Sequence, residues 1–237
     1  MGAKRPLLVY LDQNYASRIA KHLLALPGQE EFGAVWEALL ALGDRVVAPP
    51  SPFHALELHG GYLLPTFRRM FARVNQGYWV RPWQDVARRQ ARRGGIERED
   101  LLWRRSSWEE PADLDPLWGL LDLELDGDFY ARAAAARSWA RRRLGLDRAA
   151  EALPFLRFLG RLTAFHSLQE ERERRPSDLV DVVMASTVAP YVGALATDRY
   201  LREALARLAP EVRAWSGRKR EVAALADWLR GCAKVQP

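Results

Sequence analysis

The sequence predicts an α/β fold in which a central, mostly parallel sheet is flanked by helices. The first observation behind this prediction is a continuous apolar run, Leu7-Leu8-Val9-Tyr10-Leu11, of the kind that forms a buried parallel strand. A second short run, Gly193-Ala194-Leu195-Ala196, follows a helical pattern far along the chain. Between the two runs, apolar residues recur mainly at helical spacing, which is typical of helices that cover a parallel sheet.

Length and composition indicate a globular protein. The chain has 237 residues, which suits one large domain or one domain with a sizeable insertion, and its hydrophobic share of 49% excludes intrinsic disorder. The net charge of +6 favours a polyanionic partner such as nucleic acid, although a general bias towards arginine gives the same charge. A single cysteine, Cys232, excludes a disulfide framework and a Cys-rich zinc site. The apolar run near the N-terminus is too short for a signal peptide or a membrane span, so we expect a cytoplasmic protein without a membrane partner.

The first third of the chain alternates strand and helix patterns. Asp12 directly follows the first strand and stands where a helix begins. Gly43 suits the end of a later helix, and Ser51 followed by Pro52 suits the start of another. The patterns predict a helix from Asp12 to about Leu26, a helix from Glu30 to Leu42, a strand from Arg45 to Pro49, a helix from Ser51 that carries Glu57, and a helix from Pro65 to Gln76.

The segment from about residue 78 to residue 175 is predicted to be a helical insertion rich in tryptophan and arginine. Its expected helices are Asp85–Arg93, Pro116–Leu125, Asp128–Leu144 and Ala149–Glu173. We expect its tryptophans to form the core of these helices rather than platforms for stacked bases. Its arginines either form solvated faces or contact nucleic acid, and they occur in two clusters: Arg88, Arg89, Arg92 and Arg93, and then Arg141, Arg142 and Arg143.

The last quarter of the chain returns to the alternating pattern. A helix starting at Pro176 carries Asp178 and Asp181, and the strand from Gly193 to Ala196 leads into Thr197 and Asp198. The remaining elements are predicted to be a helix from Arg199 to Leu208, an edge strand from Val212 to Trp215, and a closing helix from Arg220 to Arg230.

Four acidic residues stand next to predicted strands. Asp12 and Asp198 lie at the carboxyl ends of strands, while Glu57 and Asp181 lie on helices that follow or precede strands. The carboxyl ends of parallel strands meet at one edge of a sheet, so these four side chains can converge. Each acid also has an ordinary explanation, such as a helix cap for Asp12 or a solvated side chain for Glu57.

Converging carboxylates repel one another unless a cation lies among them. Oxygen ligands alone favour Mg²⁺ or Mn²⁺ over zinc. The four histidines, His22, His54, His59 and His166, show no spacing typical of a zinc site.

In their order along the chain, four segments resemble the PIN-domain nucleases, a family that includes the ribonucleases of bacterial toxin–antitoxin pairs. They are the strand that closes on Asp12, Ser51 with Glu57 downstream, the stretch Asp181-Val182-Val183-Met184-Ala185-Ser186, and the stretch Gly193-Ala194-Leu195-Ala196-Thr197-Asp198. The resemblance implies one PIN-like three-layer domain, with a core at about 5–76 and 175–230.

The resemblance also implies a metal-dependent endoribonuclease that uses Mg²⁺ or Mn²⁺. Asp12, Glu57, Asp181 and Asp198 would be the catalytic and metal-binding acids, and Asp178 competes with Asp181 for its place. Thr197 and Asn14 would support the site, while Arg199 and the two arginine clusters would hold the phosphate backbone. RNA, an antitoxin-like protein and a second copy of the chain are the partners that this family implies.

Other classes of protein fit less well. A phosphatase of the haloacid dehalogenase type needs an Asp two residues after its first Asp, and that position is Asn14. A dinucleotide-binding fold is disfavoured because no Gly-x-Gly-x-x-Gly pattern follows the first strand. The remaining alternative is a PIN-like scaffold without catalytic activity that binds RNA or protein.

Overall fold

The computed structural model describes residues 5–58, 61–94, 96–106, 108–169 and 175–234. These residues form two compact units. The first is drawn from residues 1–80, 103–110 and 192–237, and the second from 81–102 and 111–191, in each case without the residues left undescribed. The helix that begins at Pro176 groups with the second unit, whereas the sequence suggested that it belongs with the sheet. The proposed division into one PIN-like core and one insertion stays a prediction.

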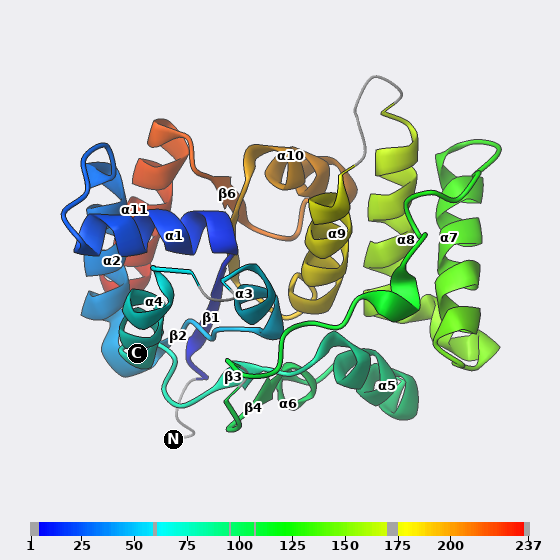
Figure 1. Cartoon of the computed structure of the whole chain (residues 1–237), viewed down its shortest axis with the longest axis horizontal. Helices are drawn as coiled ribbons and strands as arrows, with labels where there is room; N and C mark the ends of the chain where they lie inside the picture. The colour runs from blue at the N-terminus through cyan, green and yellow to red at the C-terminus, as the bar shows by residue number, and fades with distance from the viewer. Residues whose placement is uncertain (1–4, 59–60, 95, 107, 170–174, 235–237) are drawn as a thin grey trace. The chain divides into compact units, whose positions relative to one another are not determined.

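The first unit is built around a four-stranded parallel sheet, as the sequence predicted (Figure 1). In the sheet, Val9 pairs with Ala194, and Leu195 pairs with Ala214. The strands are β1 (Leu7–Leu11), β2 (Val46–Val47), β5 (Ala194–Thr197) and β6 (Ala214–Ser216), and their order is β2-β1-β5-β6.

The strand order reverses direction between the two central strands. From β1 the chain passes through helices to β2 on one side, and from β5 it passes through a helix to β6 on the other side. In open α/β sheets, the crevice at the carboxyl ends of two such strands is the usual place for a ligand. Asp12 and Asp198, which directly follow β1 and β5, stand at this position.

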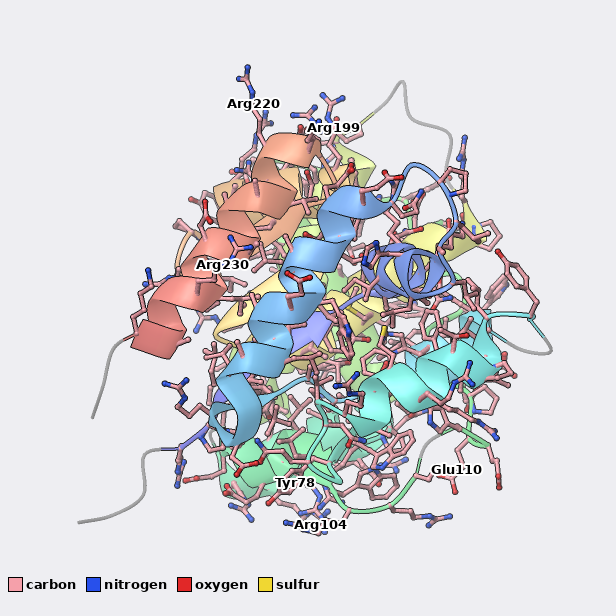
Figure 2. All side chains as sticks on the ribbon, turned by 90° about the vertical axis from the view of Figure 1, so that its left-hand side faces the viewer. Tyr78, Arg104, Glu110, Arg199, Arg220 and Arg230 are labelled. Atoms are coloured by element: carbon pink, nitrogen blue, oxygen red, sulfur yellow. The ribbon has the colours of Figure 1, made fainter. Side chains whose placement is uncertain are left out.

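Helices of the first unit bury one face of the sheet. Alternate strand residues such as Val9, Leu11 and Ala196 join a single apolar core with residues from α1, α2, α4 and α11. Two of these helices, α2 and α11, lie side by side (Figures 1 and 2). The elements are α1 (Gln13–Leu23), α2 (Glu30–Leu42), the 3₁₀ turn η1 (Gly43–Arg45), α3 (Pro52–Glu57), α4 (Leu64–Ala72), β3 (Trp79–Val80), α10 (Arg199–Leu208) and α11 (Lys219–Lys234).

The second unit is helical. Its elements are α5 (Trp83–Arg93), α6 (Arg98–Leu101), the 3₁₀ turns η2 (Asp115–Leu117) and η3 (Arg148–Ala152), α7 (Phe129–Arg143), α8 (Pro154–Ser167) and α9 (Pro176–Val188), while β4 (Leu102–Trp103) spans the boundary between the units. The buried side chain of Gln90 ties α5 to α8, because its Oε1 accepts a hydrogen bond from the Phe155 backbone N–H at 2.9 Å. Trp83 stacks on Phe155 with ring centroids 5.7 Å apart, as expected of a core tryptophan. Trp118, by contrast, is 62% exposed, so the expectation that the tryptophans form the core is wrong there.

Two helix predictions in the second unit are wrong in extent. The helix expected over Pro116–Leu125 is only the turn η2, and Gly119 follows it with a φ of 85° that no helix accommodates. The helix expected over Ala149–Glu173 is broken at Leu153, which precedes Pro154 and has an extended backbone. A residue before proline avoids the helical conformation, so η3 ends and α8 starts at this point. The expected end at Glu173 lies outside the described residues.

No described helix has the combination of length and apolar character that crossing a membrane requires.

Gly160 allows α7 and α8 to pack closely. A Cβ at this position would lie 2.5 Å from the carbonyl oxygen of Ala133 and would also overlap the Arg137 side chain. We expect Gly160→Ala to lower the free energy of unfolding by about 2 kcal/mol, because the backbone of α7 must move. Gly231→Ala is the control: nothing lies within 4 Å of its Cβ in α11, so a gain of about 0.5–1 kcal/mol is expected. Urea denaturation measures both changes, and equal effects would contradict the packing argument.

Candidate acidic site

Asp12 is fixed at the carboxyl edge of the sheet by two backbone interactions. Its backbone N–H donates to the carbonyl of Ala196 at 2.8 Å, which joins the end of β1 to β5. Its carboxylate caps α1, because Oδ1 accepts a hydrogen bond from the Tyr15 backbone N–H at 2.8 Å. Asp12 is only 4% exposed. The ordinary explanation, a helix cap, is therefore correct, and the same contacts hold the carboxylate at the switch point of the sheet.

Asp198 repeats this arrangement one strand further along. It follows β5 and caps α10, with Oδ1 accepting a hydrogen bond from the Leu201 backbone N–H at 2.7 Å. Because β1 and β5 are parallel neighbours, the two strand–Asp–helix junctions lie next to each other. The negative charge of Asp198 contributes to raising the pKa of Asp12.

Burial raises the pKa of Asp12 from 3.8 to about 7. Loss of water around a carboxylate disfavours its charged form. The nearby Thr197 hydroxyl and the Tyr15 N–H act in the opposite direction, and the charge of Asp198 adds to the increase. The Thr197 hydroxyl is close enough to favour the charged carboxylate, although it does not reach the geometry of a regular hydrogen bond.

Glu57 is the last residue of α3 and interacts electrostatically with Asp12. Its side chain is exposed, yet the protein atoms around its carboxyl group, together with the charge of Asp12, raise its pKa to about 7. Glu57 and Asp198 therefore lie close enough to Asp12 for their charges to interact, while their joint role in a site stays a prediction.

A buried hydrogen-bond network joins α3 to β1. The His54 ring bonds through Nε2 to the Leu11 carbonyl at 2.8 Å, and its Nδ1 accepts from the Ser51 backbone N–H at 3.1 Å. The Tyr10 and Ser51 hydroxyls form a second link at 2.7 Å. Sequence reasoning noted Ser51 as a cap but missed His54, whose position three residues later completes a capping box.

The network places Glu57 relative to Asp12. His54 lies one helical turn before Glu57, and Leu11 directly precedes Asp12. The hydrogen bond between the His54 ring and the Leu11 carbonyl therefore fixes the backbone around Glu57 relative to the backbone around Asp12. Burial lowers the pKa of His54 to about 4, so its ring is neutral near pH 7 and Nδ1 stays an acceptor.

The three acids of the first unit have no basic partner among the described residues. Every described ion pair involves other carboxylates. Within the same described part of the chain, no three His, Cys, Asp or Glu side chains converge closely enough to hold a metal ion. Mg²⁺ nevertheless needs only one or two carboxylates when water and substrate phosphate complete its shell. Asp12 with Glu57 or Asp198 supplies this number of carboxylates, and metal binding by either pair stays a prediction.

The two acids on α9 belong to the second unit. Asp178 is buried, and its Oδ2 accepts a hydrogen bond from the Arg175 backbone N–H at 2.9 Å, which is the capping role expected at the start of a helix. Asp181 is half-buried one turn later. Whether either residue binds metal with Asp12 stays a prediction.

A pocket of about 370 Å³ opens beside Asp198. Four of its residues were singled out in the sequence, and five were missed because they are ordinary side chains until the fold brings them together. The lining consists of Asn14, Tyr15, Arg18, Thr197, Asp198, Arg199, Ser216, Gly217 and Arg218.

Several arginines proposed to contact nucleic acid already have acidic neighbours. Arg93 pairs with the buried Asp100 at 3.2 Å, and Arg141 pairs with Glu151 at 2.9 Å. Arg88 lies 3.8 Å from Asp85, and Arg199 lies 2.9 Å from Glu203. Arg92, Arg142 and Arg143 are exposed, Arg89 is half-buried, and contact with nucleic acid stays a prediction for the whole set.

Comparison with models of known protein families, with curated proteins and with solved structures finds no match.

Proposed function

We propose that this protein is a metal-dependent nuclease that hydrolyses phosphodiester bonds in RNA. The observation that carries the proposal is that two interacting acids, Asp12 and Glu57, lie at the switch point of a parallel sheet and that both have pKa values raised to about 7. With no basic partner among the described residues, these carboxylates gain most from a bound cation. The α/β fold is then of the PIN-like three-layer kind, and this part of the proposal rests on the resemblance in sequence.

The acids of the first unit have different roles in this proposal. Asp12, held rigidly by β5 and α1, would bind Mg²⁺ or Mn²⁺ together with Asp198 or Glu57. A divalent ion in such a site activates water and stabilises charge on phosphoryl oxygens. Glu57 is exposed and has a pKa of about 7, so it can also accept a proton from an attacking water near neutral pH.

The resemblance to PIN-domain nucleases also supports RNA as the substrate and an antitoxin-like protein as a partner. Positive charge is consistent with either choice, because RNA and an acidic inhibitor are both polyanions.

The proposal is tested with labelled single-stranded RNA and purified protein in Mn²⁺ or Mg²⁺. We expect cleavage that stops when EDTA removes the ion, and a loss of about 100-fold in Glu57→Gln, because this variant lacks a proton acceptor. Glu37→Gln on the exposed face of α2 is the matched control and should cleave normally. The nuclease proposal is wrong if the wild-type protein leaves RNA intact and calorimetry detects no Mn²⁺ binding, a result that would favour the inert scaffold.

A further inference from the structure

The pocket beside Asp198 is formed at the starts of three helices. Asn14 and Tyr15 come from the first turn of α1, Asp198 and Arg199 from the start of α10, and residues 216–218 directly precede α11. The first turn of a helix presents backbone N–H groups and partial positive charge. Asp12 and Asp198 already cap the starts of α1 and α10, so the arginines of the pocket are the main feature that favours an anionic ligand.

Two buried hydroxyl groups in the pocket wall lack hydrogen-bond partners among the described residues. They belong to Tyr15 and Thr197, each only 1% exposed. A buried polar atom without a partner is costly, and native structures rarely leave one unsatisfied. The Thr197 hydroxyl already stands next to an acceptor, the Asp12 carboxylate, whereas the Tyr15 hydroxyl can donate to an acceptor such as a phosphate oxygen.

Three arginines line the same pocket against a single acid, Asp198. Arg199 and Arg218 both approach Glu203, at 2.9 and 3.7 Å. Arg18 has no acidic partner among the described residues, and its guanidinium lies over the Phe32 ring, 5.4 Å from the centroid. Figure 2 shows the side chains of Arg199 and Arg220 projecting outward. Arg220 lies in the first turn of α11.

We propose that this pocket binds a phosphate group of the nucleic-acid substrate, adjacent to the phosphodiester that is cleaved. The arginines and the Tyr15 hydroxyl supply the donors, and Arg18, which has no acidic partner among the described residues, is placed to make a bidentate contact. A pocket of about 370 Å³ lies in the range of small-molecule sites and suits one nucleotide. Asp198 borders both the pocket and the acidic site, so the bound phosphate would lie next to the reacting group. The assignment to substrate rests on the proposed function, whereas anion binding does not.

The test measures binding by calorimetry with EDTA present, so that neither metal nor cleavage contributes. Adenosine 5′-monophosphate is expected to bind, inorganic phosphate to compete with it, and adenosine to bind at least about 10-fold more weakly. Arg18→Ala should weaken binding of the monophosphate by about 10-fold, and Arg68→Ala, which removes an exposed arginine from α4 outside the pocket, should not.

Tyr15→Phe provides a second variant that keeps the packing of the ring against Phe32 and removes only the hydroxyl. We expect it to weaken binding by about 5-fold, in proportion to one lost hydrogen bond. Equal binding of adenosine and its monophosphate, or unchanged binding in both variants, would overturn the phosphate site. RNA left uncleaved in Mn²⁺ by a protein that still binds the monophosphate would overturn the nuclease proposal alone.

Discussion

Asp12→Asn is expected to abolish RNA cleavage and, at the same time, to make the folded protein more stable. Asparagine keeps the cap on α1, because it is as good a cap as aspartate, but it carries no charge to bind a cation. Cleavage should fall by about 100-fold or more, since a metal site supplies several kcal/mol of stabilisation to the transition state. The stability should rise because a buried charge is removed.

The sign of the stability change follows from the pKa of Asp12. In the unfolded chain the carboxyl group ionises near 3.8, and in the folded protein near 7. Between these pH values the unfolded state has lost the proton that the folded state still holds, so Asp12 makes stability fall as pH rises from about 4 to about 7. Above that range the variant should be more stable by about 4 kcal/mol, which raises Tm by about 8–16 °C.

Thermal denaturation at pH 5 and pH 8, with and without Mn²⁺, measures both parts of this prediction. Mn²⁺ should raise the Tm of the wild-type protein and leave that of Asp12→Asn unchanged. Asp227→Asn, which changes an exposed aspartate on α11, is the control. A variant that is less stable at pH 8, or that still responds to Mn²⁺, would contradict a cation site at Asp12.

His54→Ala is expected to be the most destabilising change in the first unit. It leaves the Leu11 carbonyl and the Ser51 N–H without partners in the interior and creates a cavity beside Phe71, whose ring centroid lies 5.0 Å from that of His54. Such changes together cost about 3–5 kcal/mol. Tyr10→Phe removes only the hydroxyl that bonds to Ser51 and should cost about 1 kcal/mol.

The pH dependence separates the role of His54 from simple packing. Its pKa is about 4 in the folded protein and 6.5 in the unfolded chain, so between these values the unfolded state binds more protons. His54 therefore makes stability rise with pH from about 4 to 6.5, opposite to Asp12. Glu57, whose pKa is also raised to about 7, opposes this rise in the same way as Asp12, so the rise should become visible in an Asp12→Asn, Glu57→Gln variant and disappear when His54→Ala is added. Urea denaturation across this range is the measurement, and a rise that persists without His54 would refute the assignment.

Strands and helices with strong local signals were predicted well. The run at 7–11 forms β1, because five consecutive apolar residues favour a strand that is covered on both faces of the sheet. The helices α2 and α10 begin and end at the predicted residues. The ends of weaker elements depended on neighbours. The strand expected over Arg45–Pro49 is reduced to Val46–Val47, because pairing with β1 stops there.

Candidate site residues were predictable where the backbone alone positions them. Asp12 and Asp198 each follow a strand and start a helix, and this local pattern is sufficient to place them at the edge of the sheet. Tyr15, Arg18 and Ser216 were not predictable in the same way. These residues line one pocket because β6 pairs with β5 and brings the start of α11 next to α1. Such a contact between distant segments leaves no pattern in the local sequence.

The order of the strands along the chain has a consequence for biosynthesis. While the ribosome is still making the second unit, β1 can pair only with β2. The other side of β1, which pairs with β5 in the folded protein, has no partner until β5 is made. Asp198, β6 and the start of α11 are translated later still. The acidic site and the pocket can therefore assemble only when synthesis has passed α11. If the proposed function is correct, a nascent chain carries no assembled nuclease site close to the messenger RNA that encodes it.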